Sequence, residues 1–284
     1  MSKTILKIRS FATGAFLALA FALALPGMAS AGEQTLTAGF SLTPQSGQFL
    51  NNGFTPANWT VDNSVATVDP LEPEILPTKK IDLTLPPSGQ MTFNPGNLAV
   101  CPDSAVNPGN VSVPVPTIVA RCPDAVIGNG TAKFVLNRNN LSPQAVLDGV
   151  VVVFNGGLQN GRPLVKIYAY SYDTMVGIYS EAALQTDGSL DFDIPQLSFD
   201  SSVSELNLAL PSKNITLNNL GPGAETVTLP KGEKSDYVQA KCSTGSFNWA
   251  TDFTFGTRDN DGTPTSPDTF ASDAGSQACT GVAG

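Results

Sequence analysis

The chain has 284 residues, 15 Lys and Arg against 24 Asp and Glu, a formal net charge of −9 and only 14% charged residues. So acidic a chain repels phosphate backbones and anionic membrane surfaces, which argues against nucleic-acid binding. Histidine is absent, which removes the most common general base and transition-metal ligand. Hydrolases built on Ser-His-Asp or Cys-His sets are therefore excluded, and no other catalytic set is recognisable.

Residues 1–31 have the pattern of a cleaved export signal. Three basic residues open the segment, an apolar run follows from Phe11 to Leu25, and Ala29-Ser30-Ala31 matches a small-x-small cleavage site. The run of 15 residues is shorter than the roughly 20 that span a bilayer. We therefore expect a secreted, extracellular protein that starts at Gly32, has no membrane span, and forms one domain over residues 32–284. Losing three basic residues would take the net charge from −9 to −12.

Short alternating runs separated by turn residues predict an all-β fold. Gly (26) and Pro (22) recur throughout, and no helical periodicity extends beyond two turns. We expect an antiparallel β-sandwich of immunoglobulin-like architecture with long Pro/Gly-rich loops.

The first half of the chain predicts one strand with a clear alternation of apolar and polar residues and one strand that is apolar at nearly every position. Thr35–Leu42 is a candidate strand, and the segment from there to Thr78 looks loosely organised. In Lys79–Leu85 the apolar residues share one face and the polar residues the other. The run Val146–Phe154 is typical of a central strand covered on both faces, and Asn155-Gly156-Gly157 is expected to be a turn.

Leu164–Ala182 predicts a hairpin. A turn at Asp173-Thr174 places Lys166 opposite Glu181 and Tyr168 opposite Tyr179. Thr resists the positive φ of such a turn, so a longer loop and a shifted register remain open. The opposite face, with Val165, Ile167, Ala169, Val176, Ile178 and Ala182, is the expected core side.

Further strands are expected later in the chain. Ser189–Ile194 and Glu205–Leu210 each place three apolar residues inward. Phe247–Phe255 places Phe247, Trp249, Phe253 and Phe255 on one face. The tail from Arg258 to Gly284 is polar and is expected to be a loop.

The four cysteines are expected to form two disulfides. We favour Cys101 with Cys122 and Cys242 with Cys279, because each pair is near in sequence, although four cysteines allow three pairings. The first pair would staple a corner between two β-hairpins. A metal site is the alternative, but no Cys-x-x-Cys spacing is present.

Several short motifs follow one another along the chain: Cys101-Pro102, Cys122 to Gly130, Phe154 to Gly157, Asp193 to Pro195, Lys234 to Cys242, and Cys279. Their order resembles a group of exported bacterial proteins of unknown function. The resemblance implies a secreted, disulfide-bonded β protein and supplies no catalytic residue.

Tyrosines dominate one face of the predicted hairpin: Tyr168, Tyr170, Tyr172 and Tyr179. Rigid rings with polar tips suit the stacking of sugar rings or a partner surface. The alternative is that they pack as ordinary core beneath another layer.

Two groups of acidic residues are weaker candidates. Asp191 and Asp193 share a strand face at a spacing within the range of inverting glycosidases, although a solvated strand face is the simpler interpretation. Asp259, Asp261 and Asp268 offer hard oxygen ligands for calcium. They lack EF-hand spacing and are also common turn residues, and no other cofactor is expected.

These observations predict an exported, non-enzymatic surface, matrix or binding protein whose partner is an extracellular protein or glycan. Two alternatives remain open: a carbohydrate-binding module that uses the tyrosine face, and a carrier of a small apolar ligand between the two sheets.

Overall fold

The computed structural model describes residues 34–68, 75–96, 98–107, 112–136, 145–195, 201–211, 215–218, 226–229, 236–257 and 263–284. They belong to one compact unit, Ala31–Gly284. The predicted export signal lies outside the described residues.

A nine-stranded antiparallel sheet, the long sheet, forms one layer. Its order is β5-β14-β3-β11-β6-β7-β8-β9, with β1 paired to β3. Its strands are β1 (Gln34–Pro44), β3 (Thr55–Thr67), β5 (Met91–Phe93), β6 (Val126–Leu136), β7 (Ala145–Gln159), β8 (Arg162–Ser171), β9 (Val176–Ala183), β11 (Ser201–Leu210) and β14 (Val238–Ala240).

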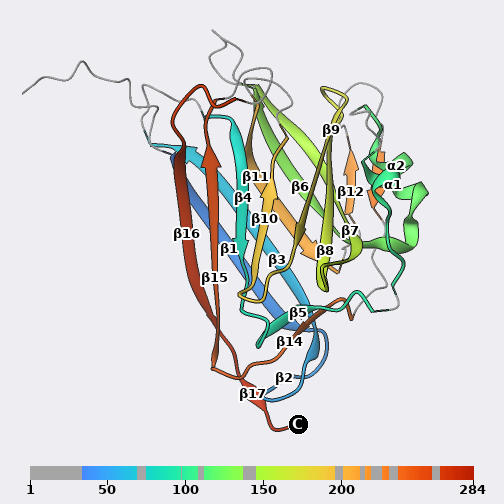
Figure 1. Ribbon diagram of the computed structural model, residues 1–284, viewed down its shortest axis with the longest axis vertical. Helices are drawn as coiled ribbons and strands as arrows, with labels where there is room; N and C mark the ends of the chain where they lie inside the picture. The colour runs from blue at the N-terminus through green and yellow to red at the C-terminus, as the bar shows by residue number, and fades with distance from the viewer. Residues whose placement is uncertain are drawn as a thin grey trace, which may run out of the picture. The chain divides into compact units, whose positions relative to one another are not determined.

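A four-stranded sheet, the short sheet, packs on one face of the long sheet (Figure 1). Its order is β10-β4-β15-β16. Its strands are β4 (Thr78–Thr84), β10 (Ser189–Asp193), β15 (Ser246–Phe255) and β16 (Thr269–Ala278). Outside the two sheets are the pair β12 (Ile215–Asn218) and β13 (Thr226–Leu229), and the parallel pair β2 (Phe49–Leu50) and β17 (Gly281–Val282).

Helices cover part of the other face of the long sheet. They are α1 (Asp103–Val106), α2 (Val115–Arg121) and the 3-10 turn η1 (Pro123–Ala125). Prolines stand at the start of each, at Pro102, Pro114 and Pro123, where a missing N–H is tolerated. We call the segment Cys101–Ala125 the helical cap. The disulfide Cys101–Cys122 forms as predicted, but it staples this cap and not a corner between two hairpins.

The predicted all-β sandwich is confirmed, with a core on each face of the long sheet. Strand β7 lies between β6 and β8 and alternates between the two cores. Val151 and Val153 pack toward the short sheet, whereas Val150, Val152 and Phe154 pack toward the cap. The prediction of a central strand covered on both faces is therefore correct.

The predicted hairpin register is also confirmed. Lys166 lies opposite Glu181, Tyr168 opposite Tyr179 and Tyr170 opposite Gly177, and the last strand pair is Ser171 with Val176. The loop residue Met175 takes a positive φ of 56°.

Three expectations were wrong. Residues 55–67, expected to be loosely organised, form β3, and much of the expected C-terminal loop forms β16. No turn forms at residues 155–157, because β7 passes through an irregularity there and continues to Gln159. The chain reverses at Asn160-Gly161, where both φ values are positive, as in a primed hairpin turn.

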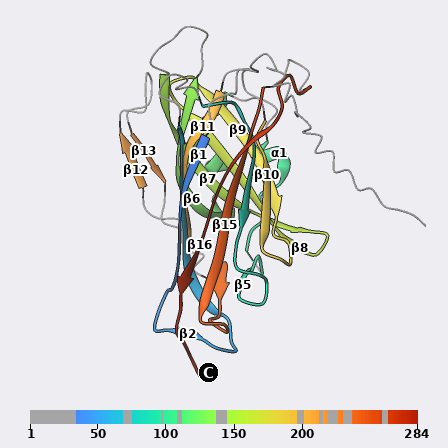
Figure 2. The same cartoon turned by 90° about the vertical axis from the view of Figure 1, so that its left-hand side faces the viewer.

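Side chains join the two sheets along their edges. At the β1–β16 seam (Figures 1 and 2), the Ala38 N–H donates to Asp273 at 2.7 Å. The Gln277 amide accepts from the Leu42 N–H at 2.8 Å and donates to the Leu42 carbonyl at 2.7 Å. Near the start of β4, Ser202 donates to the carbonyls of Ile75 and Leu76.

Removing either disulfide is expected to destabilise the fold. Cys101–Cys122 spans 21 residues and Cys242–Cys279 spans 37. The chain-entropy model gives losses of about 3 and about 4 kcal/mol for paired Cys→Ser variants. Urea unfolding measures both. An unfolding free energy that is unchanged by reducing agent would contradict the role of the disulfides as clamps.

Candidate functional site

An apolar cavity lies between the two sheets. The long sheet contributes Ala132 and Phe134 from β6, Ile167 and Ala169 from β8, Ile178 and Ser180 from β9, and Val203 and Leu206 from β11. The short-sheet side contributes Ile81, Phe192 and Ile194. The enclosed cavity volume is about 40 Å³. Ligand pockets usually measure about 300 to 1,000 Å³, so a ligand larger than a few atoms fits here only if the lining residues of the two sheets move apart.

Small residues in the long sheet create this space. Ala132 on β6 carries a short side chain, and its partner on β7, Gly149, carries none. The ring of Phe134 occupies the space beside Gly149, where an added Cβ would lie 2.4 Å from the ring atom Cε2. On β8, Ala169 is also short. The cavity is therefore the unfilled space beside Ala132 and Ala169.

The lining has almost no polar character. Ser180 is its one polar residue among those that the structure describes, and its hydroxyl donates to the Asp193 carbonyl at 2.7 Å. A buried hydroxyl or charged group on a ligand would find no free partner there, and its desolvation would oppose binding. The cavity is therefore suited to hydrocarbon surface.

The tyrosine face predicted as a stacking platform is covered by the helical cap. Tyr168, Tyr170 and Tyr172 are only 1%, 3% and 8% exposed, and they pack with Val106, Val115 and Ile118 of the cap. Tyr179 is partly buried against the same cluster. The buried rings offer no open face for a sugar, so the core alternative describes them correctly.

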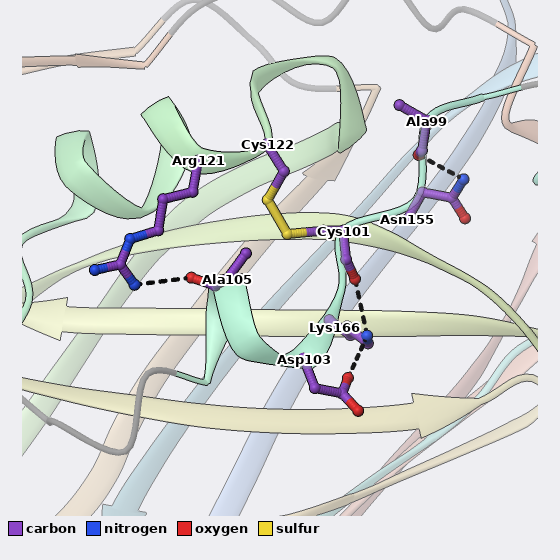
Figure 3. The surroundings of a disulfide bond; sticks show 8 residues. All are labelled: Ala99, Cys101, Asp103, Ala105, Arg121, Cys122, Asn155 and Lys166. Carbon is purple, nitrogen blue, oxygen red and sulfur yellow. Dashed lines mark hydrogen bonds and ion pairs between the residues drawn. A yellow bond between two sulfur atoms is a disulfide. The ribbon is translucent and has the colours of Figure 1, made fainter.

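Polar contacts fix the cap to the sheet. The Tyr168 hydroxyl donates to the Val113 carbonyl at 2.6 Å. Lys166, only 4% exposed, donates to the Cys101 carbonyl at 2.9 Å and forms an ion pair with Asp103 (Figure 3). Asn155 donates to the Ala99 carbonyl at 3.0 Å beside the disulfide (Figure 3). These partners show why the buried Lys166 and Asn155 are tolerated in an apolar layer.

Burial raises the pKa of all five tyrosines. The pKa reaches about 12 for both Tyr168 and Tyr172. At Tyr179, the hydrogen bond to Glu181 adds to the effect of burial. Because the folded state holds these protons more tightly than the unfolded state, its stability falls as pH rises above the unfolded value of about 10.

An alkaline titration tests this burial. Absorbance near 295 nm is expected to show no tyrosine ionising close to pH 10 in the folded protein. Ionisation should start later and coincide with loss of far-ultraviolet circular dichroism. A step of several tyrosines at about pH 10 with the fold intact would show that the cap leaves the rings open.

The carboxylates Asp191 and Asp193 lie on the outer face of the short sheet. Asp191 pairs with Asp82, which in turn pairs with Asp252, so three carboxylates form a row across β10, β4 and β15. Lys80 contacts Asp82 at 2.7 Å and Asp191 at 4.0 Å. Both Asp191 and Asp193 are exposed, as the interpretation of a solvated strand face expects.

Asp82 is disfavoured in its charged form. Burial raises its pKa, the Lys80 contact acts in the opposite direction, and the charge of Asp191 adds to the rise. Asp82→Asn is therefore expected to raise the Tm at pH 7, and the gain should vanish at about pH 3, where both states are protonated. Melting at the two pH values measures it. A lower Tm for the variant at pH 7 would show that the Lys80 contact dominates.

The predicted calcium ligands are only partly described. Asp259 and Asp261 lie outside the described residues, and Asp268 forms an ion pair with Lys79. Within the described ranges, no cluster of three or more His, Cys, Asp or Glu residues has a metal-binding arrangement. Calcium binding stays an untested prediction.

The comparisons with family models, curated proteins and solved structures find no match for this chain. Among the described residues, no helix combines the length and apolar character that crossing a membrane requires.

Sequence reasoning identified several lining residues as core and offered an apolar ligand between the sheets as one alternative, but it did not locate the cavity. Ile81, Ile167, Ala169 and Ile178 were all expected on inward faces. The cavity depends on Ala132 and Ala169 of the long sheet lining the same space as Phe192, and that arrangement is not visible before the strand order is known.

Proposed function

We propose that this protein is an exported, non-enzymatic binding protein that carries a small apolar ligand between its two sheets. The cavity lined by Ala132, Ala169 and their neighbours is the observation that supports the proposal. Its lining favours hydrocarbon over polar groups, and a ligand would enter by parting the two sheets around this small space.

Export is supported by two independent features. The two disulfides are typical of oxidising compartments outside the cytosol, and residues 1–31 carry the sequence pattern of an export signal. The motif resemblance to exported bacterial proteins points in the same direction. Binding is proposed in preference to catalysis because the sequence has no histidine.

The covered tyrosine face directs the proposal away from glycan stacking. Its rings are fixed beneath the cap, whereas the inter-sheet cavity remains unfilled. A carrier of an apolar ligand is therefore the alternative that the geometry supports best.

Filling the cavity tests the proposal. Binding of toluene and of the neutral dye N-phenyl-1-naphthylamine is measured by ligand-observed NMR and by fluorescence. Ala169→Leu adds bulk to the lining and is expected to reduce affinity at least about tenfold, because the added methyl groups occupy the ligand's space. Ala132→Val tests the same point from β6 if the first variant unfolds.

The matched control is Ala274→Leu, the same change at an exposed position on β16. It should leave binding unchanged. If neither probe binds the unaltered protein, or if Ala169→Leu and Ala274→Leu bind equally well, the proposed function is wrong.

A further inference from the structure

One side of the cavity is bounded by the last strand of each sheet. Ile178 and Ser180 come from β9, the end of the long sheet, and Phe192 comes from β10, the end of the short sheet. Because the two strands belong to different sheets, no backbone ladder joins them. They are linked in sequence by a turn, where the Gln185 N–H donates to the Ser189 carbonyl at 2.9 Å.

The β9–β10 seam has fewer crossing hydrogen bonds than the β1–β16 seam. Between the described residues of the two strands, one hydrogen bond crosses it, from the Ser180 hydroxyl to the Asp193 carbonyl. The β1–β16 seam has three such bonds, made by Asp273 and Gln277. A seam with a single crossing bond and a turn at one end opens more easily than one joined along its length.

The partly exposed residue of the lining marks the mouth. Ile194 is only partly buried, whereas the other ten lining residues are buried. It directly follows Asp193, whose carbonyl accepts the Ser180 hydrogen bond. The mouth and the crossing bond therefore lie at the same end of the seam, away from the turn at Leu184–Gly188.

We propose that ligand enters and leaves through the β9–β10 seam, and that the Ser180–Asp193 hydrogen bond is the latch that limits its exchange. This inference rests on the proposed function, since it assigns a route and a controlling residue to the same cavity. The two strands separate by rotating about the turn at Leu184–Gly188. The side chains of Ile178 and Ile194, at the end of the seam away from that turn, move apart first.

The variant Ser180→Ala removes the latch. It is expected to raise the association and dissociation rates of N-phenyl-1-naphthylamine together by about 3- to 10-fold, the range that one net hydrogen bond supports. The association rate decides the test, because Ser180 also lines the cavity and its replacement changes the binding surface, whereas a more frequent open state speeds ligand entry. Stopped-flow fluorescence measures both rates.

Gln277→Ala is the control, because it removes two bonds across the β1–β16 seam. It should lower the Tm and leave both rates unchanged. Equal acceleration in the two variants would overturn the inference, because general loosening would then explain exchange. Unchanged rates in Ser180→Ala would overturn it as well.

Hydrogen exchange on the ligand-free protein separates this inference from the proposed function. The amides of β9 and β10 should exchange faster in Ser180→Ala and stay unchanged in Gln277→Ala. If these amides exchange faster but neither probe binds, the weak seam is supported and the carrier function is wrong. If a probe binds but the amides of β9 and β10 do not exchange faster, the carrier function is supported and the role of the Ser180–Asp193 hydrogen bond is wrong.

Discussion

Burial of the long sheet on both faces is the constraint on which this structure depends. A sheet covered on one side only needs apolar residues at every second position, whereas β7 needs them at consecutive positions. The short sheet covers one face, and the helical cap covers the other. The cap is too small to have its own core, so the disulfide Cys101–Cys122 and the buried Lys166 fix it in place.

The sequence predicted those features that local pattern and chain proximity determine. Both disulfide pairings and the β8–β9 register follow from short separations and alternating residues. It failed for β3, although its inward face carries Trp59, Val61 and Val65 at the alternating spacing of a strand, and for β16, whose inward positions include Gly275 and Gln277. The signal in β3 was therefore local and was overlooked, whereas β16 carries too few apolar residues to be recognised without its partner β15.

The position of the candidate site could not be predicted from the sequence for a related reason. The alternation of apolar residues identifies those that point inward. The volume left between the sheets depends on which inward residues of the two sheets face each other. Here Ala132 and Ala169 of the long sheet line the same space as Ile81 and Phe192 of the short sheet. The tyrosines had the strongest local signal of any candidate and became core, because the helical cap lies above them.

The side chains of Asp273 and Gln277 also have a consequence for self-association. An edge strand with free N–H and C=O groups is a template for pairing with another chain, and β1 is an edge of the long sheet. Gln277 occupies both backbone groups of Leu42, and Asp273 occupies the Ala38 N–H. A chain with few charged residues is thereby protected from aggregation by blocked backbone groups as well as by its net negative charge.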